Sequence, residues 1–249
     1  MRLRLLPHAG LSRPRLSVRR PRPLTAAMAS HAGALPTWEE MWSRGLGKRE
    51  QFDVGEPSKT LVGVLARSKF AEGPGKVAFV PGCGRAYDAL ALVEHGFDTV
   101  VAMDLAPSAC DAAKAELKEI GAAAAEKVQV ECGDFFEHSG TYDFIWDCTF
   151  LCALDISVRE RWAAKHAELL AKGGRLVTCV FPICAKEGGP PYAMTVQLVR
   201  DLLEPLGFSA IDVRDPVPED ERHIPGGVVP GQATLPGTAV IVWAAPGSE

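Results

Sequence analysis

A glycine turn between two apolar runs is the feature that most constrains how this chain can fold. The first run, Lys76–Val80, leads into Gly82 and Gly84, and after an amphipathic segment at residues 89–96 a second apolar run ends in Asp104. Strand, glycine turn, helix, strand and acid in this order predict a nucleotide-binding βαβ unit. The glycines let the backbone approach a ligand closely, and Asp104, 22 residues after Gly82, is placed to accept hydrogen bonds from a ribose diol.

The residues after the glycines narrow the choice of ligand. A dinucleotide fingerprint needs a third glycine three residues after Gly84, and this chain has Tyr87 there. A ligand with ribose and adenine but no pyrophosphate fits better, and S-adenosylmethionine (SAM) is the common one. After a third strand-like run, Val128–Val130, Asp134 and Phe135 offer an acid for the adenine amino group and a ring for its face. Together these elements predict a SAM site.

The N-terminal segment differs in composition from the rest of the chain. Residues 1–38 contain seven arginines and no acid, with serines between them. Such a composition predicts an organellar transit peptide over residues 1–30, addressed to a chloroplast or mitochondrion and disordered. A basic arm for nucleic acid is the alternative interpretation. Translation from Met28 would omit the segment and leave the protein cytoplasmic.

Charge, hydropathy and cysteine usage exclude several classes of function. The formal charge of −4 becomes −11 without the seven N-terminal arginines, and an acidic body is a poor partner for a phosphate backbone, so we expect no nucleic acid. No apolar run is long enough to span a membrane, so we expect no membrane partner. The seven cysteines are odd in number and scattered, which favours free thiols in a reducing compartment. None has zinc-site spacing, so we expect no metal.

Three aromatic residues precede the first strand. Trp38 and Trp42 are four residues apart and share one face of a helix, and Phe52 follows them. Tryptophans at this spacing usually pack a helix onto the core, which is one interpretation. The other is functional, because a sulfonium is a cation that an aromatic wall would attract and shield from water. The residues alone leave both interpretations open.

Alternating helical and strand-like segments complete an α/β domain, for which we expect a seven-stranded, mostly parallel sheet with helices on both faces. The segments are a helix at Ser108–Ile120, a strand at Tyr142–Trp146, a helix opened by a capping box at Ser157–Glu160 and running to Ala171, a stop at Lys172–Gly174, a strand at Arg175–Val180, a helix at about Met194–Leu203, and strands at Ala210–Arg214 and Thr238–Trp243. The excursion at residues 215–237 is too long for a tight hairpin and is either a lid or a surface loop.

The turn after the strand at Tyr142–Trp146 is expected to face the reacting methyl group. Ligands of an open parallel sheet bind beyond the carboxyl ends of its strands, which places Asp147 and Cys148 on the acceptor side. Amine and nucleobase methyltransferases often carry an Asn/Asp-Pro-Pro-aromatic turn here, and this chain does not. Its absence counts against DNA, RNA and protein amines as acceptors.

Several segments together make the sequence similar to the plant "harmless to ozone layer" halide/thiol methyltransferases, within the thiopurine S-methyltransferase-like family. They span roughly residues 37–214 and are Trp38-x3-Trp42, Phe52-Asp53-x-Gly55, Val80-Pro81-Gly82-Cys83-Gly84, Met103-Asp104, Asp147-x2-Phe150-x-Cys152-Ala153, Phe181-Pro182-Ile183, Gly188-Gly189-Pro190-Pro191-Tyr192 and Pro205-Leu206-Gly207-Phe208. The resemblance implies a Rossmann-like class I SAM-dependent methyltransferase fold, with residues 31–75 as an N-terminal cap and residues 76–249 as the methyltransferase domain. It also implies methyl transfer to bisulfide, a thiol such as methanethiol, thiocyanate or a halide.

The resemblance further implies which residues bind SAM. They are Trp38, Trp42, Phe52, Gly82, Asp104, Asp134, Phe135 and Cys148. This chain departs from the family at three places: Phe52 stands where the family has a tryptophan, Cys148 replaces a tyrosine, and no basic segment is evident after Asp215. These departures bear most on the choice of acceptor.

In-line displacement at a sulfonium methyl group needs a nucleophile held opposite the leaving group in a dry pocket. Soft anions are already nucleophilic, so positioning can suffice without a strong base. We expect Tyr192 or Asp147 to orient a small or anionic acceptor, with Arg222 or His223 as further anion contacts, in a monomeric enzyme. The alternatives are a thiopurine or arsenic methyltransferase, a non-catalytic SAM-binding module, and a nicotinamide oxidoreductase, which the missing third glycine disfavours.

Overall fold

The computed structural model describes residues 37–121, 125–228 and 235–248 of the chain. The predicted transit peptide at residues 1–30 therefore lies outside the described residues. Among the helices that are described, none combines the length and the apolar character that a membrane span requires.

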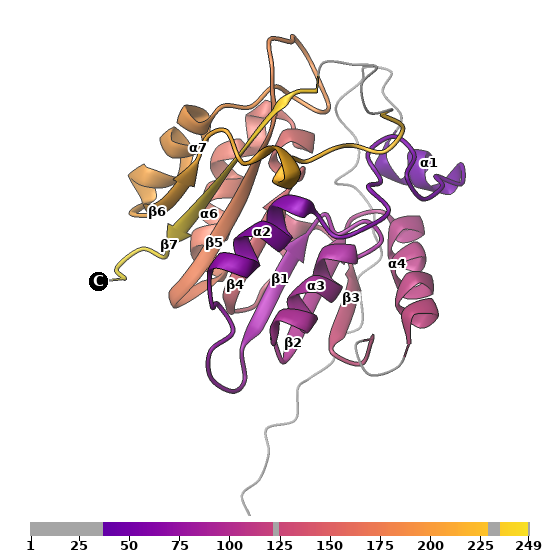
Figure 1. The fold of residues 1–249 in the computed structure, drawn as a ribbon, viewed down its shortest axis with the longest axis horizontal. Helices are drawn as coiled ribbons and strands as arrows, with labels where there is room; N and C mark the ends of the chain where they lie inside the picture. The colour runs from indigo at the N-terminus through magenta and orange to yellow at the C-terminus, as the bar shows by residue number, and fades with distance from the viewer. Residues whose placement is uncertain (1–36, 122–124, 229–234, 249) are drawn as a thin grey trace, which may run out of the picture. The chain divides into compact units, whose positions relative to one another are not determined.

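A seven-stranded sheet forms the centre of the molecule, in the order β3-β2-β1-β4-β5-β7-β6 (Figure 1). The strands are β1 (Val77–Pro81), β2 (Thr99–Asp104), β3 (Val128–Cys132), β4 (Tyr142–Cys148), β5 (Leu170–Ile183), β6 (Ser209–Arg214) and β7 (Gly237–Ala244). Strands β1 to β5 pair in parallel, and β7 runs antiparallel to both of its neighbours. The predicted seven-stranded, mostly parallel sheet is confirmed.

Helices cover both faces of the sheet, as predicted. They are α1 (Trp38–Ser43), α2 (Lys59–Arg67), α3 (Tyr87–His95), α4 (Pro107–Ile120), α6 (Arg159–Leu169) and α7 (Val196–Leu203), with single 3₁₀ turns η1 (Phe135–Glu137), η2 (Leu151–Ala153), η3 (Ile156–Val158), η4 (Glu204–Leu206) and η5 (Glu219–Glu221). One core lies under α2, α3 and α4, and the other lies under α6 and α7. Each core buries aromatic side chains of the strands, Phe144 and Trp146 in the first and Phe79 and Trp243 in the second.

The expected capping box at Ser157–Glu160 is wrong. Helix α6 begins at Arg159, and its N-cap, Val158, makes no side-chain hydrogen bond. The Asp155 carboxylate instead accepts hydrogen bonds from the backbone N–H and the hydroxyl of Ser157, at 2.9 and 2.6 Å. The serine is thus engaged in the preceding 3₁₀ turn and cannot cap the helix.

The boundary after α6 also differs from the expectation. The helix ends at Leu169, and β5 starts at Leu170 and continues through the expected stop at Lys172–Gly174. The strand accommodates the glycines because its pairing with β4 shifts register between Tyr142 and Phe144. Helix α2 was not expected, although three of its buried residues, Leu61, Val64 and Leu65, have helical spacing.

Candidate active site

The glycine turn and Asp104 form one hydrogen-bonded unit at the carboxyl ends of β1 and β2. The backbone N–H groups of Gly84 and Ala106 donate to the two carboxylate oxygens of Asp104, each at 3.0 Å. Gly82 has a φ of 62°, and a Cβ added to it would lie 2.6 Å from Cδ2 of Phe150. Burial raises the pKa of Asp104, and the backbone hydrogen bonds partly offset this effect. The turn therefore holds an acid at the position expected for a ribose contact.

The aromatic residues of the cap lie against this turn. Trp42 is buried, and a Cβ added to Gly84 would lie 3.4 Å from its ring. The Phe52 ring meets those of Trp38 and Trp42 edge-on, with centroids 5.5 and 5.8 Å apart. The tryptophan helix does pack onto the domain. Contact of these rings with a sulfonium stays a prediction.

One set of hydrogen bonds starts α1, and another fixes it beside α4. Thr37 and Glu40 form a capping box that starts α1. The Glu39 carboxylate accepts hydrogen bonds from the hydroxyl and backbone N–H of Ser108, at 2.6 and 3.0 Å. The Ser108 hydroxyl contributes most, and its backbone N–H next, to lowering the pKa of Glu39. Helix α1 is thereby attached to the first turn of α4, close to Asp104.

The adenine side of the expected donor site is only partly as predicted. The Asp134 carboxylate accepts a backbone N–H of η1 at 2.9 Å and so stabilises the turn after β3. The Phe135 ring is buried in the core and packs against Phe150 with centroids 5.0 Å apart, so it does not offer a free face to adenine. Leu105, directly after Asp104, is 41% exposed and was not anticipated. Its position directly after Asp104, the predicted ribose contact, was the signal that could have identified Leu105 as a candidate apolar contact for adenine.

The expectation that Asp147 contacts the acceptor is not supported by its position. Its side chain is 2% exposed. The carboxylate accepts a hydrogen bond from Nε1 of Trp162 at 2.8 Å and one from the backbone N–H of Leu151 at 3.3 Å, and His166 lies 3.4 Å away. Asp147 is therefore directed into the core beneath α6, where it holds the turn that follows β4.

Cys148 lies on the other side of β4 and faces the excursion. Its sulfur is 3.8 Å from Nδ1 of the buried His223, and Cys179 is its neighbour in register on β5. The hydrogen bond with Cys179, together with burial, raises the pKa of the Cys148 thiol well above its usual value. Cys148 is thus a protonated thiol at neutral pH. Arg222 donates to two carbonyls of the excursion itself, at 3.0 and 3.2 Å, which indicates a structural role.

Tyr192 lies beside a buried arginine, Arg159, which falls within the segment Ser157–Glu160 and was not among the expected site residues. The backbone N–H of Tyr192 donates to the carbonyl of Cys152 at 2.7 Å, and Cζ of Arg159 lies 5.5 Å from the centroid of the Tyr192 ring. Arg159 is 8% exposed. Among the described residues its Nε has no hydrogen-bond partner, and its Nη2 meets the sulfur of Met194 at 4.0 Å.

Arg159 therefore has unused capacity to bind an anion. Burial lowers its pKa, but a guanidinium stays charged in proteins. A buried positive charge with an unsatisfied donor is costly unless it is paired. Asp155 already acts on this charge electrostatically, and an anion beside Tyr192 would give Nε the hydrogen-bond acceptor that it lacks.

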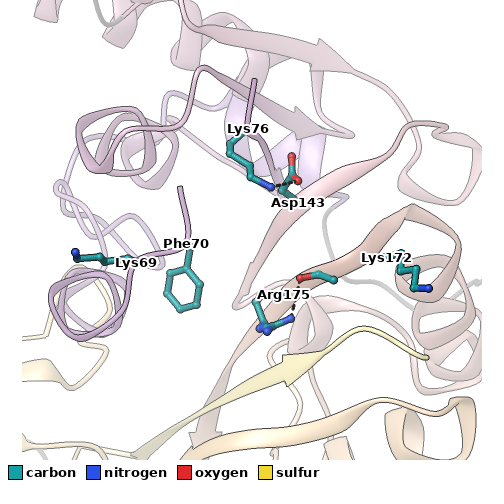
Figure 2. A pocket seen from close by; sticks show the side chains of 7 residues that line it. Lys69, Phe70, Lys76, Asp143, Lys172 and Arg175 are labelled. Atoms are coloured by element: carbon teal, nitrogen blue, oxygen red, sulfur yellow. Dashed lines mark hydrogen bonds and ion pairs between the residues drawn. The ribbon is translucent and has the colours of Figure 1, made fainter. Parts of the chain in front are cut away.

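A cavity lies at the opposite end of the sheet and does not belong to this site. It has a volume of about 380 Å³ and is lined by Lys69, Phe70, Lys76, Asp143, Lys172, Gly173 and Arg175 (Figure 2). Lys76 and Asp143 form an ion pair of 2.7 Å next to the start of β1, whereas the glycine turn follows the end of that strand.

Comparison with known proteins relates the chain to one family. The sequence profile of the family described as Thiopurine S-methyltransferase (TPMT) matches residues 34–232. Over 180 residues, or 72% of this chain and 76% of the relative, the chain is 34% identical to "Probable thiol methyltransferase 2" of Arabidopsis thaliana. It is 32% identical to thiocyanate methyltransferase 1 of Brassica oleracea over 72% of this chain and 76% of the relative. It is also 32% identical to thiopurine S-methyltransferase of Azotobacter vinelandii over 67% and 80%.

Solved structures agree with the fold. Magnesium protoporphyrin IX methyltransferase from Synechocystis, solved with bound S-adenosylhomocysteine (SAH), superposes with a TM-score of 0.59 at 17% identity, over 76% of this chain and 83% of that one. The glycopeptide N-methyltransferase MtfA, solved with SAM, gives a TM-score of 0.57 at 14% identity, over 81% and 100%. Both have the class I methyltransferase fold, and the sheet order of this chain agrees with that fold.

Proposed function

This chain belongs to the thiopurine S-methyltransferase family and is a SAM-dependent methyltransferase that acts on a small nucleophile, and we propose that its acceptor is a soft anion: bisulfide, a thiolate such as methanethiolate, thiocyanate or a halide. The observation that carries this proposal is the buried Arg159, whose Nε lacks a partner among the described residues. A neutral acceptor without a suitable oxygen, nitrogen or sulfur lone pair would leave that Nε without a hydrogen-bond partner.

The donor side of the chain suits SAM. The glycine turn has no room for a Cβ at Gly82, which is typical of a backbone that a ligand approaches closely. The Asp104 carboxylate lies at the carboxyl edge of the sheet, where a ribose diol would bind, and the exposed Leu105 beside it offers an apolar contact for adenine. When bound, SAM supplies a methyl group on a sulfonium sulfur.

The chain's own residues then need to hold the acceptor and exclude water. Arg159 would neutralise and orient the anion, with the Tyr192 ring beside it. A lone pair on the acceptor forms the new bond to the methyl carbon while the bond from that carbon to the sulfonium sulfur breaks, so the electron pair leaves with SAH. No proton needs to move when the acceptor is already an anion, and catalysis rests on positioning and desolvation.

Headspace gas chromatography tests the proposal. The purified protein is incubated with SAM and, in separate vials, with bisulfide, methanethiol, thiocyanate and iodide. We expect a volatile methylated product, formed with an equal amount of SAH, from at least one of these acceptors. If SAM binds by calorimetry and none of them is methylated, the acceptor is not a small soft anion, and a larger thiol such as a thiopurine becomes the next acceptor to assay.

Tyr192 is assayed in the same way. Replacement of Tyr192 by Phe keeps the ring next to Arg159 and removes only the hydroxyl. If this variant turns over at the wild-type rate, the hydroxyl takes no part in orienting the acceptor, and the role of Tyr192 is confined to its ring and backbone.

A further inference from the structure

One buried ion pair links the cap to the glycine turn. Nε of Arg85 donates to Oδ2 of Asp53 at 2.9 Å, and the two side chains are only 14% and 3% exposed. Nη2 of Arg85 donates to the carbonyl of Leu46 at 2.5 Å. Its Cζ also lies 5.5 Å from the centroid of the Trp42 ring. Arg85 directly follows Gly84, so one side chain on the turn makes three separate contacts with the cap.

The part of the cap around Asp53 also contacts the excursion at residues 215–237. Oδ1 of Asp53 accepts the backbone N–H of Arg49 at 3.0 Å, and the carbonyl of Arg49 accepts the N–H of Gly227 at 2.8 Å. A Cβ added to Gly226 would lie 2.1 Å from the carbonyl oxygen of Asp53, so the two backbones are in direct contact. Asp53 therefore lies where the glycine turn, the cap and the excursion meet.

We propose that the Arg85–Asp53 ion pair is the latch of a lid over the donor site, and that Arg85 is a positioning residue for SAM. Trp42 covers Gly84, whose N–H holds Asp104, so the cap cannot move off the turn without breaking the ion pair and exposing Trp42. Opening this lid sets the rate at which SAM enters and SAH leaves. The proposal rests on SAM dependence and is independent of the acceptor proposed above.

Charge gives the latch a second consequence. SAM carries one more positive charge than SAH, because its sulfur is a sulfonium. In the wild-type protein Asp53 neutralises Arg85 next to the donor site. Removal of the Asp53 charge leaves a cation there and disfavours SAM relative to SAH, whereas removal of the Arg85 charge leaves an anion and favours SAM relative to SAH. An ion pair remote from the donor site would not shift this ratio in opposite directions.

The experiment compares Arg85→Met, Asp53→Asn and the double variant with the wild type. Lys76→Met is the matched control, because it breaks the Lys76–Asp143 ion pair at the opposite end of the sheet (Figure 2). Stopped-flow tryptophan fluorescence gives the SAH dissociation rate, calorimetry gives the dissociation constants of SAM and SAH, and urea unfolding identifies any variant that does not fold.

We expect each single variant to release SAH about tenfold faster, which corresponds to about 1.4 kcal/mol. We expect the double variant to be no faster than the singles, since the two residues form one interaction, and Lys76→Met to be unchanged. The ratio of SAM to SAH affinity should fall in Asp53→Asn and rise in Arg85→Met, each by a few-fold. Unchanged release rates, additive effects in the double variant, or equal ratios in the two single variants would each overturn the latch.

Arg85→Lys keeps the experiment decisive if Arg85→Met does not fold. It retains the charge and loses the fork that reaches both Asp53 and Leu46. We expect it to release SAH at a rate between the wild type and tenfold faster, with the wild-type ratio of affinities. A wild-type release rate in this variant would contradict the proposal. If the wild-type protein itself binds neither SAM nor SAH, it is the SAM-dependent activity that fails, and the two failures are thus distinguishable.

Discussion

At the scale of single residues, substitutions at Gly82 and Gly73 distinguish the cost of steric crowding from the cost of backbone strain. Both have positive φ values, 62° and 92°, but a Cβ at Gly82 meets Phe150 at 2.6 Å and one at Gly73 meets nothing within 4 Å. We predict that Gly82→Ala costs about 1–3 kcal/mol more of the free energy of unfolding than Gly73→Ala, and that it alone weakens SAM binding. Urea unfolding and calorimetry measure both quantities. Equal effects of the two substitutions would show that the glycine turn is not tightly packed.

The ribose contact predicted for Asp104 would make donor binding sensitive to acid. Burial raises the pKa of its carboxyl group above the usual 3.8, so the folded protein takes up this proton at a higher pH than the unfolded chain does. Ionised Asp104 therefore costs stability at neutral pH, and that cost disappears as pH falls through the raised pKa. The protonated group is also a poorer acceptor for a ribose diol.

We accordingly predict that SAM affinity falls on acidification, with a midpoint above pH 3.8. The measurement is calorimetric titration of SAM at a series of pH values. Asp104→Asn is expected to bind SAM more weakly at neutral pH and to lack this acid limb. Because burial also raises the pKa of Asp88, the variant is needed to assign the transition. If SAM affinity of Asp104→Asn still falls on acidification as in the wild type, the transition belongs to another group.

Asp147 and Phe135 show what sequence could not decide at this scale. Both were correctly placed at the carboxyl edge of the sheet, since parallel strands all end at the same edge. Which way each side chain points depends on the partners available in three dimensions. Trp162 donates a hydrogen bond to the Asp147 carboxylate, and the Phe135 ring packs against Phe150 in the core. Arg159 was missed for the same reason, because only the structure shows that it is buried with an unpartnered donor.

At the scale of elements, two identical capping signatures have different outcomes. Thr37 and Glu40 form the box that starts α1, whereas Ser157 is bonded to Asp155 and leaves α6 without a side-chain cap. The local pattern was the same, and a neighbouring carboxylate decided between them. Apart from α2, which was missed, the sequence predicted the centres of the helices and strands, because periodicity reports burial. It could not weigh such competing hydrogen bonds.

This difference is testable. We predict that Thr37→Ala destabilises α1 by about 1 kcal/mol, seen as faster hydrogen exchange of the Met41 amide, which donates to the Thr37 carbonyl. Ser157→Ala is expected to leave the exchange of the α6 amides unchanged. The observed capping would be contradicted if the α6 amides of Ser157→Ala exchanged faster, relative to the wild type, than the Met41 amide of Thr37→Ala.

At the scale of the whole molecule, the residues predicted to bind SAM and the acceptor gather at one edge of the sheet. The glycine turn, Asp104 and the cap aromatics lie at the carboxyl ends of β1 and β2. Asp147 and Cys148 are the last residues of β4, which is the neighbour of β1 in the sheet. The mostly parallel sheet with helices on both faces was predictable, because alternating helices and strands leave few arrangements. Strand β5 ran longer than predicted because a register shift absorbs its two glycines.

The measurement that tests the central claim most directly is the kinetics of Arg159→Met with thiocyanate, or with the best acceptor of the headspace panel. Arg161→Met is the matched control, since Arg161 lies two residues away on α6 and its Cζ rests 4.4 Å from the Phe136 ring centroid. We predict that Arg159→Met lowers kcat/KM for the anion by about 10- to 100-fold, the loss expected for a charged hydrogen bond, with an unchanged dissociation constant for SAM. Equal kcat/KM values in the two variants would contradict an anion site at Arg159.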